Sequence, residues 1–269
     1  MKRYHVLHKK RGETPLEVLA AWKEQYSQYQ DVRASYAGRL DPMASGKLLI
    51  LLGEECKNQK KYTRLDKEYE IEILLDVGTD TGDILGLPSL SGMATHPSIP
   101  QLDEVFRKEK GSHERAYPVY SSKTVKGVPL FLYALKGTLD TISIPTHTET
   151  IYKTKVLDVT KLSLEEVSER IQKGLEVVPR DPSESKKEGA DFRQDEVRAQ
   201  WQTLLSSLPP RDFTLVRVRV TAGTGTYMRS LAERTGEALG TRAVAVSIHR
   251  ARIGKYVPLL GGFWVREYN

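Results

Sequence analysis

The chain has little cysteine and no long apolar run. Its 269 residues include one cysteine, Cys56, which excludes an intrachain disulfide and a cysteine-cluster zinc site. No apolar stretch approaches the ~20 residues that a membrane-spanning helix needs. The first residues, "MKRYHVLHKKRGETP", are basic but lack the apolar core of a signal peptide. We therefore expect a cytoplasmic protein that binds no membrane, with Cys56 as a buried small residue.

Motifs for metals and nucleotides are also missing. The 6 histidines are dispersed, and no pair has the short spacing of a metal site. In "GTDTGD", Asp80 and Asp83 lie close together without the calcium-loop pattern, so we interpret both as residues of a solvated turn. The segment "AGTGT" lacks the lysine of a phosphate loop, and no G-x-S-x-G elbow occurs, although a Ser-His-Asp triad stays open. We expect no metal and no cofactor.

The charge balance is basic. Lys and Arg number 41 against 35 Asp and Glu, a net charge of +6. This excess is compatible with a phosphate-rich partner, because neutralising phosphates releases counterions, but it is weak support on its own. A hydrophobic content of 39% and a charged content of 28% are typical of a globular protein. The length allows one large core, and we expect a single domain over residues 1–269.

Helices and strands alternate irregularly along the chain. In "ETPLEVLAAWKEQY", Thr14, Pro15 and Glu17 form the start signal of a helix, a cap followed by a capping box. The run "KLLILLG" is ambiguous between a buried strand and a helical turn. Alternating patterns predict strands in "KEYEIEILLDVG" and "DFTLVRVRVTAG". Without a regular βαβ order, a mixed α+β sheet domain is favoured.

The remaining segments complete this outline. We predict a short helix ending at Gly137, a strand within 141–162, and a helix in "YMRSLAERTGEALG" that ends at Gly240. Residues 180–200 are charged and poor in large apolar side chains, so we interpret them as a surface insertion or mobile loop, flanked by helix.

The candidate catalytic residue is Asp41, in the small-residue segment "SYAGRLDPMASGKLLI". An aspartate there could form a turn, bind a metal or act as a nucleophile. The nucleophile needs a cation that keeps it ionised, and Arg229, just inside a helix after a glycine turn, is such a cation. Tyr227 and Tyr69 offer aromatic faces on which a base could stack. Each also has a plain structural interpretation, Tyr69 as a core strand residue and Arg229 as a surface helix residue.

Five segments, in sequence order over almost the whole chain, resemble the motifs of the tRNA pseudouridine-55 synthase family (TruB). "HKKRGETP" resembles its K-P-x-G-x-[ST]-S opening, with Lys10 in place of proline. "AGRLDPMASG" resembles its G-x-L-D-P-x-A-[ST]-G block, and "KEYEIEILLDVGTDTGDILG" its K-x-Y and T-D-T-x-D blocks. "YPVYSSKTVKGVPLFLYALKG" and "GTGTYMRSL" resemble the two remaining blocks. Five matches in order are far more specific than one.

This resemblance implies a fold, a reaction and roles for named residues. The fold is a mixed, mainly antiparallel sheet flanked by helices, and the partner is the T-arm stem-loop of tRNA. The reaction isomerises the uridine at position 55 after base flipping, with Asp41 as the catalytic residue. Tyr69, Tyr227 and Arg229 bind the substrate, and Tyr69 is also a candidate base. Arg39, Tyr36 and Lys123 are candidate RNA contacts. Nothing marks an obligate protein partner, and we expect a monomer.

Some positions depart from the family motifs. Tyr36 replaces a histidine, Thr224 replaces the lysine before Gly-Thr-Tyr, and Ala251 replaces an apolar residue, so the wall of the pocket is expected to be more open there. The sequence ends with "GKYVPLLGGFWVREYN", and we therefore expect a short form without the C-terminal PUA domain of many bacterial members. Two alternatives stay open: a catalytically weakened RNA-binding or tRNA-folding protein, and a synthase acting on ribosomal RNA.

Overall fold

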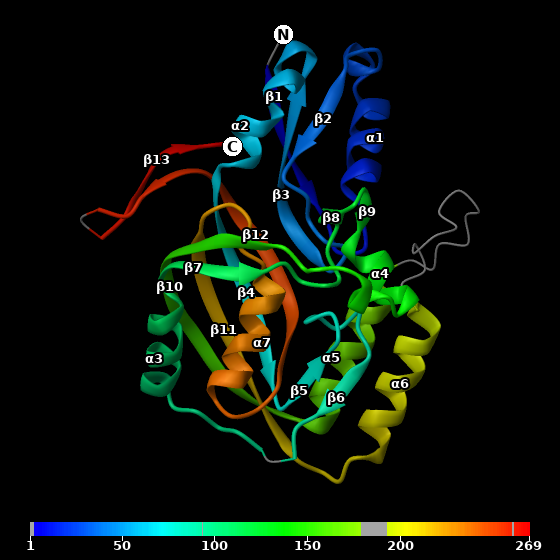
Figure 1. Ribbon diagram of the computed structural model, residues 1–269, viewed down its shortest axis with the longest axis vertical. Coiled ribbons are helices and arrows are strands. Elements are labelled where there is room, and N and C mark those ends of the chain that lie inside the picture. Colours follow the sequence, from blue (N-terminus) through cyan, green and yellow to red (C-terminus); the bar gives the residue numbers. More distant parts are fainter. Residues whose placement is uncertain (1–2, 93, 179–192, 260) are drawn as a thin grey trace.

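The computed structural model describes residues 3–92, 94–178, 193–259 and 261–269 (Figure 1). The helix predicted from its start signal is confirmed: α1 begins at Pro15, and Thr14 and Glu17 form the expected capping box. The helices are α1 (Pro15–Gln25), α2 (Gln59–Thr63), α3 (Ile99–Glu109), α4 (Leu130–Lys136), α5 (Leu164–Glu176), α6 (Gln194–Ser207) and α7 (Met228–Ala238).

A large sheet crosses the molecule and is mainly antiparallel, as predicted. In the described chain its strand order is β1-β3-β12-β4-β11-β10-β7, with β2 beside β3 and β13 beside β12. One parallel contact joins β12 to β3. The strands of this sheet are β1 (Tyr4–Lys9), β2 (Ala34–Ala37), β3 (Ala44–Leu52), β4 (Asp66–Leu75), β7 (Gly111–Ala116), β10 (Thr146–Ser163), β11 (Asp212–Ala222), β12 (Ala243–Val257) and β13 (Phe263–Glu267).

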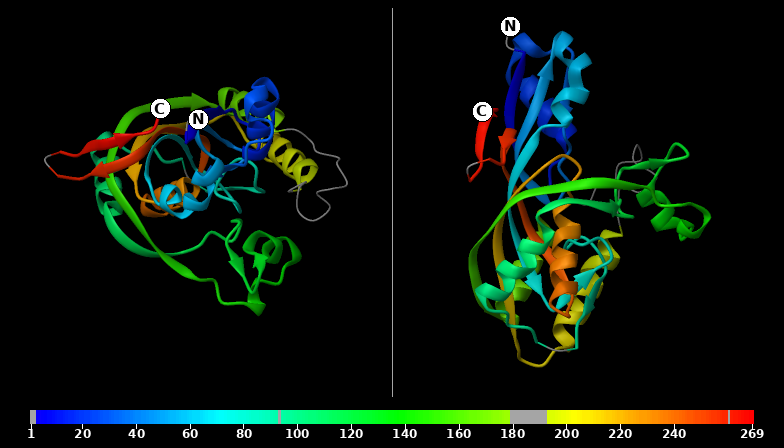
Figure 2. Two further views of the ribbon diagram at one scale, coloured as in Figure 1. Left: turned by 90° about the horizontal axis from the view of Figure 1, so that it is seen from above. Right: turned by 60° about the vertical axis from the view of Figure 1, so that its left-hand side comes forward.

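Two smaller hairpins lie outside this sheet. One pairs β5 (Val77–Thr79) with β6 (Pro88–Leu90), and the other pairs β8 (Thr124–Val125) with β9 (Val128–Pro129). The second hairpin and α4 lie at the end of an arm that extends from β7 and β10, as Figure 2 shows in its right-hand view. Gly137 ends α4 in a left-handed conformation, which confirms the predicted end of that helix.

Helices cover the central strands on both faces. On the face seen in Figure 1, α3 and α7 pack on alternate residues of β4 and β11, including Ile71, Val218 and Val220. On the other face, α5 and α6 cover one end of the same strands, around Leu74 and Leu215. The predicted alternation of the two central strands is therefore confirmed, because their odd and even positions face different layers.

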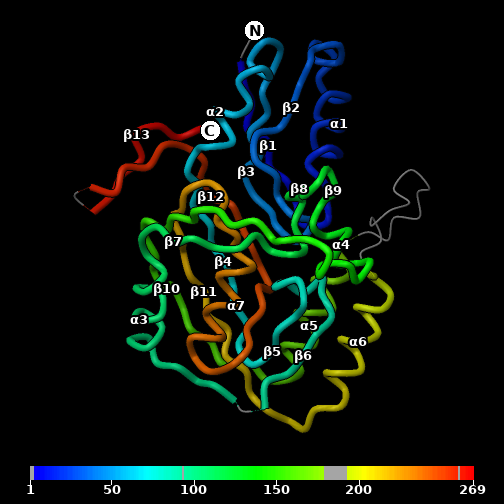
Figure 3. The backbone as a smooth tube through the Cα atoms, viewed as in Figure 1, coloured from blue at the N-terminus to red at the C-terminus, as the bar shows by residue number. Residues whose placement is uncertain are grey.

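The N-terminal strands and α1 extend above the central body, and both chain ends lie near this upper part (Figure 3). Leu19 and Trp22 of α1 pack on Leu48 and Ile50 of β3. The ambiguous run "KLLILLG" is therefore a strand, and Leu48–Leu51 are fully buried. A strand covered on both faces reads as a continuous apolar run, which is why its sequence lacks alternation.

The prediction for residues 180–200 is partly wrong. Residues 179–192 lie outside the described residues, but helix α6 begins at Gln194 and continues to Ser207. Trp201 of this helix is 1% exposed and donates a hydrogen bond from its indole nitrogen to the Ile84 carbonyl. A flanking helix was expected, but its start lies inside the 180–200 range, because its few apolar residues are spaced widely among charged ones. No helix among the described residues is long and apolar enough to cross a membrane.

Candidate active site

The loop between β2 and β3 carries Asp41 into a cavity of about 520 Å3. The backbone nitrogen of Ala44 donates to the Asp41 carbonyl at 2.9 Å, and that of Gly12 donates to the Pro42 carbonyl at 2.9 Å. The Asp41 side chain is 45% exposed toward the cavity. The segment therefore does form a turn, and this turn places the Asp41 carboxylate in the cavity.

Two buried cations hold this loop by its carbonyl groups. Lys9 Nζ donates to the Ala44 carbonyl at 2.6 Å, and burial lowers the pKa of Lys9 to about 8. The Arg250 guanidinium is 1% exposed and donates to the carbonyls of Gly38, Arg39 and Lys47 at 3.2, 3.3 and 2.7 Å. Burial also lowers the pKa of Arg250. These bonds give buried donors their partners and tie the Asp41 loop to β1 and β12.

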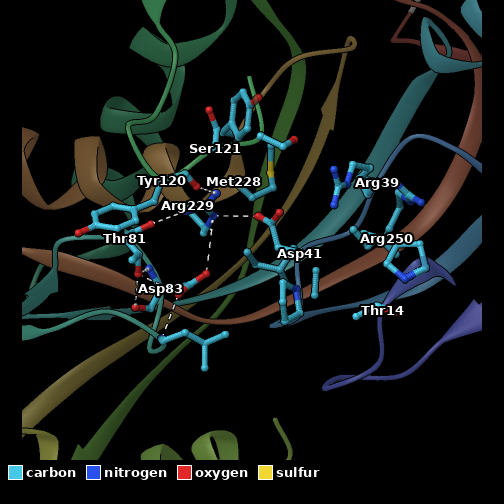
Figure 4. A pocket seen from close by; sticks show the side chains of 18 of the residues that line it. Thr14, Arg39, Asp41, Thr81, Asp83, Tyr120, Ser121, Met228, Arg229 and Arg250 are labelled. Atoms are coloured by element: carbon cyan, nitrogen blue, oxygen red, sulfur yellow. Dashed lines mark hydrogen bonds and ion pairs between the residues drawn. The ribbon is translucent and has the colours of Figure 1, made fainter. Parts of the chain in front are cut away.

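Arg229 lies opposite Asp41, one residue inside α7 (Figure 4). Its Nε donates to Asp41 Oδ2 at 2.9 Å, while its two terminal nitrogens donate to the carbonyls of Thr81 at 2.6 Å and Tyr120 at 3.1 Å. The predicted contact between this arginine and Asp41 is therefore confirmed. Arg229 is 4% exposed, however, so its alternative interpretation as a surface helix residue is wrong.

Asp83 also belongs to this ion network, which corrects its interpretation as a solvated turn residue. It is 4% exposed, and its Oδ2 lies 3.6 Å from Arg229 Nε. Burial raises the pKa of the Asp83 carboxyl, and Arg229 partly offsets that rise. Burial opposes the charge on Arg229, but Asp41 and Asp83 raise the pKa of its guanidinium above the usual arginine value. Arg229 therefore remains a fixed cation beside Asp41.

The turn interpretation holds better for Asp80. This exposed residue accepts a hydrogen bond from the backbone nitrogen of Leu87 at 2.8 Å. It also pairs with Arg193 at 2.7 Å and accepts from the Tyr120 hydroxyl at 3.0 Å. Asp80 thus connects the turn to the start of α6 and to the segment that supplies the Tyr120 carbonyl.

A third carboxylate lies one helical turn beyond Arg229. Glu233 is half-buried on α7, close to Gly82 of the loop that carries Asp83. Burial, with Glu237 and Asp83 adding to it, raises the pKa of Glu233 to about 7, and Arg229 opposes the rise. No sequence motif signalled this residue, because its environment depends on the distant turn that packs against the helix.

The two predicted tyrosines line the same cavity as Asp41. Tyr69 lies on β4, where its partner across the sheet is Arg250, and its ring packs against the core beneath α7. Tyr227 precedes the first residue of α7, and burial together with Asp41 raises its pKa to about 12. Tyr227 is therefore a neutral phenol near pH 7. The structure brings together two aromatic rings, a carboxylate and a buried guanidinium.

The candidate RNA contacts divide into two groups. Arg39 is exposed and lines the cavity, whereas Tyr36 and Lys123 are not among the described residues that line it. Tyr36 packs instead beside the cluster formed by α1 and β3. Lys123 Nζ lies 4.8 Å from the ring centroid of Tyr117, whose ring is 6.2 Å from that of Tyr227.

The departures from the family motifs have different outcomes. Thr224 lines the cavity, and its hydroxyl donates to the Thr63 carbonyl at 2.8 Å. Ala251 was expected to open the pocket wall, but among the described residues of β12 the wall is formed by Ile248 and Arg250. The expectation of a wider wall at Ala251 is therefore wrong, because alternate strand residues point away from the cavity.

Sequence reasoning missed the residues that hold the site together. Lys9, Asp83 and Arg250 are all less than 5% exposed, and each contacts Arg229 or the Asp41 loop. The T-D-T-x-D block was a signal for Asp83, but its position in a polar, turn-rich segment suggested exposure. Among the described residues, no group of three or more His, Cys, Asp and Glu side chains could hold a metal ion.

Comparison with known proteins places this geometry in a family. Residues 25–177 match the model of the TruB family pseudouridylate synthase, N-terminal domain. A tRNA pseudouridine synthase B from Cupriavidus metallidurans is 29% identical over 224 residues, which are 82% of this chain and 54% of the relative. One from Caldanaerobacter subterraneus is 34% identical over 125 residues, 46% of this chain and 43% of the relative. The chain spans about half the length of these curated relatives.

A solved structure supports the fold. A chain from a crystal structure titled as a Cbf5-Nop10-Gar1 complex aligns with a TM-score of 0.54 at 20% identity, covering 93% of this chain and 48% of that chain. Its identity is too low to carry more than the fold. The family match covers more than half of the chain and includes Asp41, Tyr69 and Asp83. The chain belongs to the TruB family of pseudouridylate synthases.

Proposed function

We propose that this protein isomerises a uridine in the T-loop of tRNA, at position 55, to pseudouridine. The observation that carries the proposal is the ion pair of Asp41 with buried Arg229 inside a cavity large enough for a flipped nucleotide. A uridine stacked in RNA cannot expose its glycosidic bond and C5 edge, so the enzyme must take it out of the stack at a cost of a few kcal/mol. The cavity supplies aromatic rings for the displaced base.

The residues would divide the work as follows. Tyr69 stacks on the uracil, an interaction worth ~1–3 kcal/mol per base, and Tyr227 packs against the same nucleotide. Arg229 orients Asp41, because all three of its nitrogen groups have fixed partners. Arg39, exposed at the cavity, contacts RNA phosphate.

The reaction conserves all atoms. The bond between C1′ and N1 breaks, the uracil turns, and a bond between C1′ and C5 forms. The C5 proton is then lost and N1 gains one, with Tyr69 as a candidate base for the C5 proton. Asp41 starts the reaction as nucleophile or base on the sugar–uracil unit. Both choices use the carboxylate of Asp41, whose Oδ2 accepts a hydrogen bond from Arg229 Nε.

The test is Asp41→Asn, with Asp103→Asn on the exposed face of α3 as the matched control. Tritium release from C5-tritiated tRNA should be abolished in the first variant and unchanged in the second, while tRNA affinity stays within a few-fold for both. Pseudouridine formation by Asp41→Asn contradicts the assignment. Wild-type protein that binds T-arm RNA without forming pseudouridine would instead be an RNA-binding or tRNA-folding protein, and modification confined to ribosomal RNA would change the substrate.

A further inference from the structure

A second pocket lies on the face of the sheet opposite the catalytic cavity. On β4, Lys67 and Tyr69 line the catalytic cavity, whereas Glu68 between them lines this second pocket, of about 260 Å3. Arg219 of β11 points to the same side, because its neighbours Val218 and Val220 face the core beneath α7. The two pockets are therefore back to back and separated by the sheet, so one nucleotide cannot occupy both.

The lining of this rear pocket is mainly cationic. Lys153, Lys155, Arg219 and Arg252 contribute four positive charges, and Glu68 is the acid among the lining residues. The acids in and around the pocket have partners already. Glu70 pairs with Arg219 at 2.6 Å, while Glu68 and Glu267 lie 3.6 and 3.8 Å from Arg252.

The two lysines are the cations left for a ligand. Lys153 and Lys155 are exposed, and within the described parts of the chain neither has a salt bridge. Lys153 Nζ reaches only the Gly261 carbonyl, at 3.4 Å. They are neighbours on one face of β10, spaced to contact successive anionic groups of an extended ligand.

The hairpin of β12 and β13 projects from the edge of the molecule (Figure 2). It contributes two aromatic residues, Tyr256 and Trp264, to the lining of the rear pocket. Tyr256 and Trp264 pack edge to face, with ring centroids 5.3 Å apart. The backbone nitrogen of Tyr256 donates to Asp66 at 2.9 Å. A Cβ added at Gly262 would lie 1.6 Å from the Tyr256 hydroxyl, so the Tyr256 ring lies directly against the turn of the hairpin. The two rings therefore line the pocket on its hairpin side.

We propose that this rear pocket binds a single-stranded segment of RNA, with backbone phosphates at Lys153 and Lys155 and a base against Trp264. Proteins that bind single strands combine a cationic groove with aromatic faces, and both occur here on adjoining strands. The inference rests on the proposed action on RNA and adds a second RNA-binding site to the catalytic cavity. The rear site takes a different RNA segment from the one that enters the catalytic cavity.

The experiment uses decaadenylate RNA, which contains no uridine, and the intrinsic tryptophan fluorescence of the full chain. Trp22 and Trp201 are buried, whereas Trp264 is half-exposed, so RNA bound at the rear should quench Trp264. We expect quenching in the wild type and none in Trp264→Phe. Lys153→Ala/Lys155→Ala should weaken binding about 5- to 30-fold and reduce the slope of log K against log[salt] by about 1.4. Lys161→Ala, on the same strand but paired with Asp212, is the control and should change neither.

The outcomes separate this site from the catalytic one. Single-turnover pseudouridine formation at saturating tRNA should be unchanged in the control Lys161→Ala, which lies outside both pockets. If the wild type binds decaadenylate at Trp264 but forms no pseudouridine, the rear site is supported and the proposed function is contradicted. Equal affinity of the double variant and Lys161→Ala overturns the rear site. Equal quenching by a decaglutamate peptide also overturns it, in favour of an acidic protein partner.

Discussion

Arg229 shows how one side chain can organise an active site. Its three nitrogen groups are each committed to a different segment: Asp41, the Thr81 carbonyl and the Tyr120 carbonyl. A planar guanidinium with fixed donors has little freedom to turn, so it orients the carboxylate as well as balancing its charge. A lysine could supply the charge but not the three directions.

Asp83 should matter for turnover more than for binding. In Asp83→Asn, Arg229 keeps Asp41 but loses its second carboxylate, which leaves the guanidinium less firmly fixed. We expect kcat to fall about 10- to 100-fold, as for other residues that orient a reacting group, with KM nearly unchanged. The free energy of unfolding should fall by about 1–3 kcal/mol. Steady-state kinetics and urea unfolding measure the two effects, and an unchanged kcat would contradict the role.

Glu233 should make stability depend on pH. Its pKa is about 7 in the folded chain against 4.5 as the reference for an unfolded one. The folded state therefore binds more protons between pH 4.5 and 7, and the free energy of unfolding falls as pH rises through that window. Glutamine does not titrate, so Glu233→Gln does not lose this stability as the pH rises. The free energy of unfolding of the variant minus that of the wild type should increase by on the order of 2 kcal/mol between pH 4.5 and 7 and then level off.

Urea unfolding at pH 5, 6, 7 and 8 checks this expectation. Glu165→Gln is the matched control, since Glu165 lies exposed on α5 and is not among the groups that raise the pKa of Glu233. A constant difference between Glu233→Gln and wild type across this range would show that the carboxyl titrates as an exposed group.

At the scale of elements, the site depends on how closely β3 approaches β12. Gly46 has a φ of 110°, and a Cβ there would lie 2.3 Å from the Arg250 carbonyl oxygen. This contact belongs to the parallel pairing of the two strands. The same strand segments carry the end of the Asp41 loop and the guanidinium that binds its carbonyls.

The substitution Gly46→Ala should therefore be much more costly than Gly53→Ala. Gly53 follows the other end of β3 with a φ of 56°, and a Cβ there meets nothing within 4 Å. Alanine at position 53 must adopt a left-handed backbone conformation, which lowers the free energy of unfolding by about 1–2 kcal/mol. At Gly46 the backbone of β12 must also move, so we expect a total above about 3 kcal/mol and reduced turnover. Similar urea midpoints for the two variants would refute the close approach as the cause.

Elements with local signals were predicted well from the sequence. Helix α1 has its capping box, α4 its terminal glycine, and β4 and β11 their alternation. Strand β3 was ambiguous and the start of α6 was misplaced, because burial on both faces or among charged neighbours removes the periodic signal. Caps and terminal glycines predict where an element begins or ends. They do not predict which other elements will pack against it.

At the scale of the molecule, one sheet brings distant segments into a single site. Asp41 and Arg229 are 188 residues apart in sequence, and the cavity is lined by residues from Gly12 to Arg250. Strands β3, β12, β4 and β11 are consecutive neighbours in the sheet, although they are far from consecutive in the chain. A ligand in this cavity therefore contacts strands, helices and the loops that carry Asp41, Thr81 and Tyr120.

RNA binding should therefore stabilise the whole chain as one unit. With Asp41→Asn, which cannot turn over, T-arm RNA at 100 times its Kd should add about 2.7 kcal/mol to the free energy of unfolding. For a chain of this size Tm should rise by about 5 °C or more, in a single transition. Differential scanning calorimetry measures it, with a T-stem duplex lacking the loop as control. An equal shift with that duplex, or none with either RNA, would exclude the cavity as the T-loop site.

The sequence by itself determined the position of Asp41 in its turn, the place of Arg229 just inside a helix, and the alternation that put Tyr69 on one face of β4. Those features depend on local chemistry: caps, turns and the spacing of apolar residues. Only the tertiary structure decided that Asp83 is buried against Arg229 and that Tyr36 packs away from the cavity. Burial and the pKa of a group are set by strands and helices that pair from distant parts of the chain, which no local pattern records.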